Sequence, residues 1–202
     1  MKSLQISADT KAADICKEIF IVIMKRNLFI LIYAFVCISL NAEITRSVYG
    51  VSLGMTAEQA KNIINAKGLT FYIEDSKIGM TINVEHPFFA GVQWDGLVLT
   101  IFGGKVYSIT FGKDTYNYNE IATDVYTLVS KLDKYQAYGV EDQSYHTDTE
   151  GGTIFNYLWN DGKTALSIAG EALYYGKSSL STTYLDIALY YKYLSTKSKD
   201  EL

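Results

Sequence analysis

The stretch that decides the fold is LVLTIFGGKVYSITF, residues 97–111. Apolar residues alternate on both sides of Gly103 and Gly104, and a period of two predicts strands with one buried face. A Gly-Gly pair between two such runs predicts a tight hairpin, because its central positions need positive φ angles. A second hairpin is predicted in TIFNYLWNDGKTALSI, residues 153–168, around the turn at 160–162.

Two amphipathic segments predict helices that precede these strands. In GMTAEQAKNIINAKG, residues 54–68, Thr56 and Gln59 have the spacing of a capping box, and Gly68 ends the run. In NEIATDVYTLVSKLDKY, residues 119–135, Asn119 is the predicted cap and apolar residues recur at helical spacing. Alternation also predicts a strand at 78–84, and a last long strand in TTYLDIALYYKYL, residues 182–194.

The order of these elements predicts an α+β fold made of two tandem repeats. Each repeat is a helix followed by an antiparallel β-meander, and the helices are expected to pack on one sheet face. The first module is expected over residues 43–115 and the second over residues 116–195. A polar tail is expected at 196–202.

The segment from Met24, MKRNLFILIYAFVCISLNAE, has the pattern of a secretory signal peptide. A basic pair precedes an apolar run, and Ala42 precedes Glu43. The run is shorter than the roughly 20 residues that span a bilayer, so we expect cleavage after Ala42 and no membrane-spanning segment afterwards. Residues 24–42 are then the signal peptide, and 1–23 are a non-native or mis-assigned extension. The alternative is an uncleaved anchor, because Leu40 fits the cleavage motif poorly.

The segment from Glu43 onward contains no cysteine, because Cys16 and Cys37 both precede it. It therefore offers no disulfide and no thiolate chemistry. Its 19 acidic and 13 basic residues give a net charge of −6, and Arg46 is its single arginine. This balance argues against nucleic acid as a partner.

The chain ends in KDEL, residues 199–202, the retention signal of the endoplasmic reticulum. With a signal peptide it would form a complete luminal address, so an endoplasmic-reticulum luminal protein is one alternative. After Glu43, however, the chain has no cysteine and no Asn-x-Ser/Thr acceptor, both of which such a resident could use. We interpret the four residues as a chance match and expect a periplasmic or secreted protein.

Candidate catalytic and metal-binding residues are few. His146, Asp148 and Glu150 alternate in an extended segment, but they lack the further ligands of a calcium loop, which favours a solvated turn. His86 has no nearby partner pattern for general-base chemistry. Adjacent carboxylates such as Glu74 and Asp75 point to opposite faces of a strand. The sequence predicts no enzyme, no metal site and no cofactor.

Aromatic residues are the candidate ligand-binding groups. Trp94 and Trp159 occupy comparable places in the two halves, and the alternative for both is burial in the core. Tyr174 and Tyr175 lie in GEALYYGKSS, a predicted loop, where tyrosine combines apolar contact with a polar tip. Tyr107 extends this set if it points away from the helices.

The segment YGVSLGMTAEQAKNIINAKGL, residues 49–69, resembles the opening of modules in the small outer-membrane assembly lipoproteins of the SmpA/OmlA type and in beta-lactamase inhibitory protein. The matching positions are Gly54, Thr56, Gln59 and Ala60. The chain lacks the lipidated cysteine and the Gly-x-Pro that follows the first helix in those proteins. The resemblance implies a tandem α+β fold and a binding role in bacteria, and it transfers no site residue.

These observations predict an exported, non-enzymatic binding protein of the bacterial cell envelope. It is expected to recognise a protein or envelope component through an open sheet face and a tyrosine-rich loop. The alternative is a glycan- or small-ligand-binding module that uses aromatic stacking. An enzyme with a dispersed site is the least favoured class, because His86 and His146 lie far apart in the sequence.

Overall fold

The computed structural model describes residues 43–132, 134–135, 141–142, 145–147 and 151–200. The chain divides into two units, residues 1–42 and 43–202. The predicted signal peptide, both cysteines and the last two residues of KDEL lie outside the described residues.

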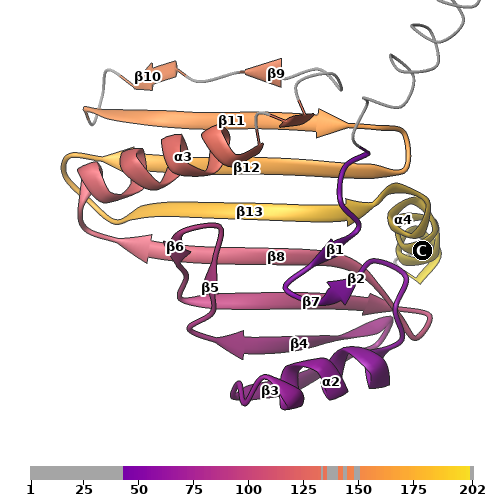
Figure 1. Cartoon of the computed structure of the whole chain (residues 1–202). Helices are drawn as coiled ribbons and strands as arrows, with labels where there is room; N and C mark the ends of the chain where they lie inside the picture. Colours follow the sequence, from indigo (N-terminus) through magenta and orange to yellow (C-terminus); the bar gives the residue numbers. More distant parts are fainter. Residues whose placement is uncertain (1–42, 133, 136–140, 143–144, 148–150, 201–202) are drawn as a thin grey trace, which may run out of the picture. The chain divides into compact units, whose positions relative to one another are not determined.

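The second unit is an α+β structure built on one large antiparallel sheet (Figure 1). Its strand order is β10-β11-β12-β13-β8-β7-β4-β3, and short β9 also pairs with β11. Both predicted hairpins are present, β7–β8 around Gly103-Gly104 and β11–β12 around 161–163. The strands are β3 (Phe71–Ser76), β4 (Gly79–Glu85), β7 (Gly96–Phe102), β8 (Lys105–Thr115), β9 (Glu141–Asp142), β10 (Tyr145–Thr147), β11 (Gly152–Asn160), β12 (Thr164–Leu173) and β13 (Ser178–Asp186).

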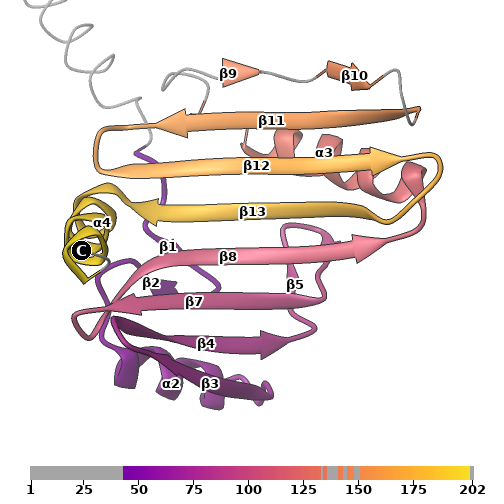
Figure 2. The same ribbon diagram turned by 180° about the vertical axis from the view of Figure 1, so that it is seen from behind.

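Helices α2 (Ala57–Ala66) and α3 (Tyr118–Leu132) cover the same face of this sheet; they lie in front of it in Figure 1 and behind it in Figure 2. The predicted capping box of α2 is confirmed, because the Thr56 hydroxyl accepts from the Gln59 N–H and Gln59 reaches back to Thr56. The N-terminal cap of α3 lies two residues earlier than predicted. Asn117, not Asn119, supplies the capping oxygen, which accepts the Asn119 N–H at 3.1 Å.

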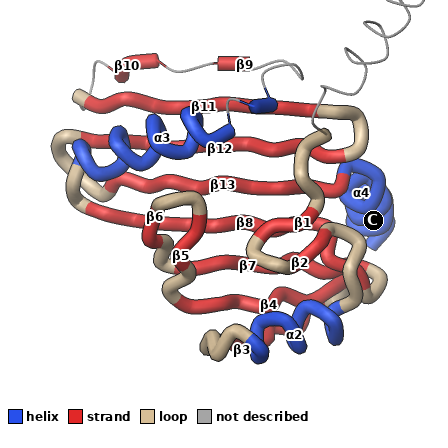
Figure 3. Tube along the Cα trace, viewed as in Figure 1, coloured by secondary structure: helices blue, strands red, loops and turns tan. Residues whose placement is uncertain are grey.

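Two small hairpins fill the same face between the helices (Figure 3). They are β1 (Ser47–Val48) with β2 (Val51–Ser52), and β5 (Phe88–Phe89) with β6 (Val92–Gln93). The second turns at Ala90-Gly91, both with positive φ, and the Trp94 indole N–H donates to the Phe89 carbonyl at 3.1 Å. These hairpins close the core where the helices leave a gap.

The core lies between the sheet and the two helices and two hairpins that cover one of its faces, which we call the covered face. Phe111 on β8 is at its centre; it stacks on Phe89 with ring centroids 4.6 Å apart and lies 5.6 Å from Trp94. The predicted apolar stripe of α3 is buried, with the exception of Val129, which is half-buried. Other fully buried large side chains are Ile64, Ile82, Leu97, Leu99, Ile109, Ile121, Tyr135, Trp159 and Tyr184.

A third helix, α4 (Ile187–Asp200), corrects the predicted last strand. β13 ends at Asp186, whose carboxylate accepts the N–H of Leu189 at 2.9 Å and thereby caps the helix. The helix lies at the end of the sheet where β13 ends (Figure 2) and extends through most of the expected polar tail. No helix in the described ranges combines the length and apolarity that crossing a bilayer requires.

The first residues of this unit are fixed to the sheet. Ile44 is buried, and its N–H donates to the Asp161 carboxylate at 3.0 Å. The Arg46 guanidinium forms an ion pair with Asp186 and donates to the Thr164 hydroxyl at 3.2 Å. The segment that begins at Glu43 therefore connects the β11–β12 turn to the start of α4.

Candidate functional site

The sheet face opposite α2 and α3 carries mainly small and polar side chains, together with the larger side chains of Ile154, Leu158, Val98 and Tyr72. Strand alternation and antiparallel register place these residues in three rows across the sheet, which we call the open face. The rows are Leu158, Ser167, Thr183, Thr110, Val98, Asn83 and Tyr72; then Asn156, Ala169, Ser181, Gly112, Gly96 and Glu85; then Ile154, Glu171, Ser179 and Asp114.

Hydroxyl groups link the middle of the open face. The Thr110 and Thr183 hydroxyls lie 3.1 Å apart across β8 and β13, and the Ser108 hydroxyl lies 3.3 Å from that of Thr110. The contact between Thr110 and Thr183 joins residues that are 73 positions apart in the sequence. They fix the hydroxyl positions on a half-exposed surface, so the face offers ordered hydrogen-bonding groups to a partner.

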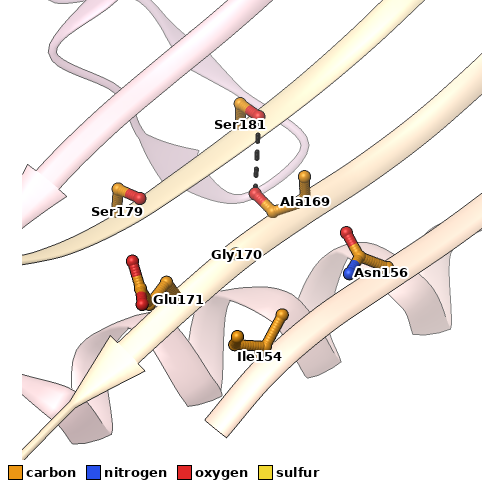
Figure 4. Close-up of a pocket in the computed structure, with 7 residues that line it drawn as sticks. All are labelled: Ile154, Asn156, Ala169, Gly170, Glu171, Ser179 and Ser181. Atoms are coloured by element: carbon orange, nitrogen blue, oxygen red, sulfur yellow. Dashed lines mark hydrogen bonds between the residues drawn. The ribbon is translucent and has the colours of Figure 1, made fainter. Parts of the chain in front are cut away.

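A shallow depression of about 260 Å³ lies on the open face where β11, β12 and β13 run side by side (Figure 4). Its floor is the backbone of β12 with the small Ala169 side chain, whereas a Cβ at Gly170 would point to the covered side, toward Leu180 and Val125. Around it stand a carboxylate, an amide, two hydroxyls and one branched apolar group. The residues concerned are Glu171, Asn156, Ser179, Ser181 and Ile154.

The polar groups of this depression are largely unused within the fold. The Ser181 hydroxyl donates to the Ala169 carbonyl at 3.4 Å, as the dashed line in Figure 4 marks. Within the described part of the chain, the side chains of Glu171, Asn156 and Ser179 form no hydrogen bond or ion pair. These groups are therefore available to a ligand.

The predicted tyrosine loop lies between β12 and β13, and its two rings differ. Tyr174 stacks on Tyr118 at the start of α3, with ring centroids 4.1 Å apart, and Tyr118 reaches the buried Thr153 hydroxyl at 3.0 Å. The hydrogen bond with Tyr118 raises the pKa of Tyr174. Tyr174 therefore belongs to the covered side, although 60% of it is exposed, whereas Tyr175 is 84% exposed.

Tyr107 is enclosed by α4 and is not a surface aromatic. It is 7% exposed and stacks on Tyr193 and Tyr190, at 5.2 and 6.3 Å between ring centroids. Burial, followed by the neighbouring phenols of Tyr193 and Tyr190, raises the pKa of Tyr107 to about 12. Its position explains how the third helix is held against the sheet.

Trp94 and Trp159 are both core residues, with 0% and 1% of their surface exposed. Trp94 lies beside Phe111, and Trp159 stacks on Tyr157 with ring centroids 6.1 Å apart. Neither indole face is open to a ligand. Of the five aromatic residues expected at a binding site, the structure thus leaves Tyr175 fully accessible and Tyr174 partly so.

The histidine and carboxylate candidates do not gather into a site. His86 is exposed and has a positive φ of 48°, at the bend between β4 and β5. Asp148 and Glu150 lie outside the described residues, and so does the side chain of His146. Across the described ranges, no three His, Cys, Asp or Glu side chains are close enough to hold a metal ion.

Sequence reasoning missed the lining of the depression. Glu171, Asn156 and Ser179 come from three strands, and their only signal is that each occupies an outward position in an alternating strand. Comparison with known proteins adds no further guide, since no family model, curated protein or solved structure matches the chain.

Proposed function

We propose that this chain is an exported, non-enzymatic binding protein of the bacterial cell envelope, periplasmic or secreted. It recognises a protein or envelope component through the open face, with Tyr175 at the end of the sheet. The observation that carries this proposal is the open face itself, where ordered hydroxyls lie near a depression whose Glu171, Asn156 and Ser179 side chains have no partner within the described fold. Unsatisfied polar groups on a fixed sheet favour recognition by hydrogen bonds.

Binding is proposed in preference to catalysis because the depression is shallow and open to water. Acid–base and electrostatic catalysis both depend on groups that are positioned against each other and shielded from solvent. The depression contains a single carboxylate, Glu171, and no histidine among its lining residues. This set suits hydrogen bonding to a partner and provides no pair for proton transfer.

Export is supported by the way the fold begins. The compact unit starts at Glu43, and Ile44 and Arg46 already make contacts with the β11–β12 turn and with Asp186. Removal of residues 1–42 would therefore leave each of these contacts in place. A signal peptide over residues 24–42 is consistent with this arrangement.

The order of elements supports the proposal of two tandem modules, residues 43–115 and 116–195. Apart from short two- or three-residue strands, helix α2 is followed by β3, β4, β7 and β8, and helix α3 is followed by β11, β12 and β13. The two sets join edge to edge through β8 and β13. This layout is the one that the resemblance to the SmpA/OmlA type and to beta-lactamase inhibitory protein implies.

The proposal is tested by capture of partners from the envelope fraction of the organism that encodes the protein. The variant Thr110→Arg/Thr183→Arg places two long charged side chains at the centre of the open face and should abolish capture. Its matched control, Asn62→Arg/Asn65→Arg, adds the same charges to the exposed side of α2 and should leave capture unchanged. Equal recovery by both variants, with unchanged urea midpoints, would show that the open face is not the binding surface.

A further inference from the structure

We infer that the depression on the open face is a subsite for one basic side chain, lysine or arginine, of a protein partner. This inference rests on the proposed function and adds the chemistry of the group that is recognised.

The size of the depression suits one side chain. Its volume of about 260 Å³ is below the roughly 300 Å³ at which pockets for drug-sized ligands begin. Its floor is the backbone of β12 at Ala169 and Gly170, and Ile154 offers apolar contact at one side (Figure 4). An aliphatic stem can therefore lie along Ile154 while a charged head reaches the polar groups.

The lining groups are acceptors that a cationic head would satisfy. The Glu171 carboxylate, the Asn156 amide oxygen and the Ser179 hydroxyl have no side-chain partner in the described structure. A lysine head has three donors and an arginine head has five, and neither has an acceptor. A charge-assisted hydrogen bond to Glu171 is roughly twice as strong as one between neutral groups.

The charge of the surrounding surface attracts the same group. The three rows of the open face contain the carboxylates of Glu85, Asp114 and Glu171 and no lysine or arginine. Lys177, in the loop before β13, is engaged with Asp114 at 2.7 Å. Because Lys177 neutralises Asp114, the net negative charge of the three rows comes from Glu85 and Glu171. A net negative surface raises the local concentration of basic groups, so a basic segment of a partner is drawn to this face.

Other ligand classes fit the depression less well. Sugar sites combine hydrogen bonds with an aromatic ring for stacking, and none of the seven lining residues is aromatic. Calcium and magnesium ions prefer six or more oxygen ligands, and the lining has one carboxylate. Phosphate groups are repelled by a face with this charge.

The test is an NMR titration of the ¹⁵N-labelled protein with capped tripeptides, acetyl-Gly-Arg-Gly-amide and acetyl-Gly-Lys-Gly-amide. We expect saturable shifts of the Gly170, Glu171, Ser179 and Ser181 amides and of the Asn156 side-chain amide. Acetyl-Gly-Gln-Gly-amide, which is uncharged, should produce none. The shifts should weaken as salt is raised, because Glu171 is exposed.

Two variants separate a specific subsite from diffuse attraction. Glu171→Gln removes the charge at constant shape and should weaken binding of the arginine peptide at least fivefold. Glu85→Gln removes a charge from a neighbouring row of the same face and should change it less than twofold. Equal weakening by both variants, absence of shifts at the depression, or a matching response there to methyl glucoside would each overturn the inference.

Failure of this inference differs from failure of the proposed function. If the peptides do not bind but Thr110→Arg/Thr183→Arg still abolishes partner capture, the open face remains the binding surface and the basic subsite is wrong. If the peptides bind as expected while that variant captures partners normally, the proposed use of the open face fails, and with it the assignment of the peptide site to partner recognition.

Discussion

Along β13 the side chains alternate between two environments that have little in common. Leu180 and Tyr184 are buried beneath the helix-covered face, whereas Ser179, Ser181 and Thr183 lie on the open face, and β8 repeats the contrast with Phe111 beside Thr110. Burial of apolar surface is the main source of stability, at roughly 25 cal/mol per Å². The covered face therefore determines whether the chain folds.

The open face contributes little to that stability, and this leaves its composition free for another use. Side chains on opposite faces of a strand do not contact each other, so a serine or threonine there can be changed without disturbing the core. An antiparallel sheet tolerates one solvated face, but such a face need not carry a depression with unpaired acceptors. That the covered face provides stability and the open face does not can be tested by substituting neighbouring residues that point to opposite faces.

The largest contrast is expected between Phe111→Ala and Thr110→Ala. Phe111 is fully buried and stacks on Phe89, so its removal should lower the free energy of unfolding by about 3–5 kcal/mol. Thr110→Ala should cost less than about 1 kcal/mol, because its hydroxyl is half-exposed and makes contacts near 3 Å that water can replace. Urea unfolding of both variants measures the difference, and similar costs would contradict the distinction between the faces.

A smaller decrease in the free energy of unfolding is expected for a charged residue on the covered face. Lys113 lies on β8 under α3 and forms ion pairs with Glu120 at 2.6 Å and Asp124 at 2.7 Å. Lys113→Gln leaves both carboxylates without their cation and should lower the free energy of unfolding by about 2 kcal/mol. This decrease is smaller than for a fully buried ion pair, because Glu120 is partly exposed. Lys105→Gln, on the same strand at an exposed position, is the control and should cost under about 0.5 kcal/mol.

The same cluster predicts a dependence on pH. Hydrogen bonds from Lys113 and Thr115 lower the pKa of Glu120, so its contribution is present above the ordinary glutamate value of about 4.3 and is lost as pH falls through the lowered pKa. Burial opposes the charge on Lys113, but hydrogen bonds with Asp124 and Glu120 outweigh it and raise its pKa. The urea midpoint of the natural protein should fall as pH is lowered from 6 to 3, and that of Lys113→Gln should fall less.

Where β13 ends and α4 begins, the stability of the structure depends on the polar contacts of Asp186 more than on the side chains of either sheet face. Asp186 caps α4 through the Leu189 N–H and also pairs with Arg46. Asp186→Ala removes both contacts and should lower the free energy of unfolding by about 2 kcal/mol. Asp186→Asn keeps a capping oxygen and should lower it by about 1 kcal/mol. Faster hydrogen exchange of α4 amides in the alanine variant, with protection of β7 and β8 retained, would accompany the loss; unchanged exchange would count against this role.

The features predicted correctly from the sequence are those with local signals. The hairpin at Gly103-Gly104, the capping box at Thr56 and the stripe on α3 each lie within a few consecutive residues. The third helix was missed because LDIALYYKY, residues 185–193, fits both the strand period and the helix period. Leu185, Ile187 and Leu189 alternate as in a strand, whereas Tyr190 and Tyr193 are three residues apart and meet Tyr107 from one side of a helix.

The candidate site depended on non-local pairing that the sequence does not display. Trp94 is buried because the β5–β6 hairpin folds beside it, with positive φ angles at Ala90 and Gly91 that no turn motif predicted. Glu171 and Ser179 become neighbours through the register of β12 and β13, and Asn156 joins them through β11. Outward positions can be found from alternation, but which of them meet across strands follows from register alone.

The smallest effects are expected at the two tyrosines of the loop, which test where the covered side ends. Tyr174→Ala removes the stack on Tyr118 and should cost about 1 kcal/mol, a typical value for an aromatic pair. Tyr175→Ala should change the free energy of unfolding by less than about 0.5 kcal/mol, because its ring is 84% exposed. Urea unfolding distinguishes the two. If Tyr175→Ala proved the more costly variant, Tyr175 would belong to the packed structure and could not be counted among the surface groups free to meet a partner.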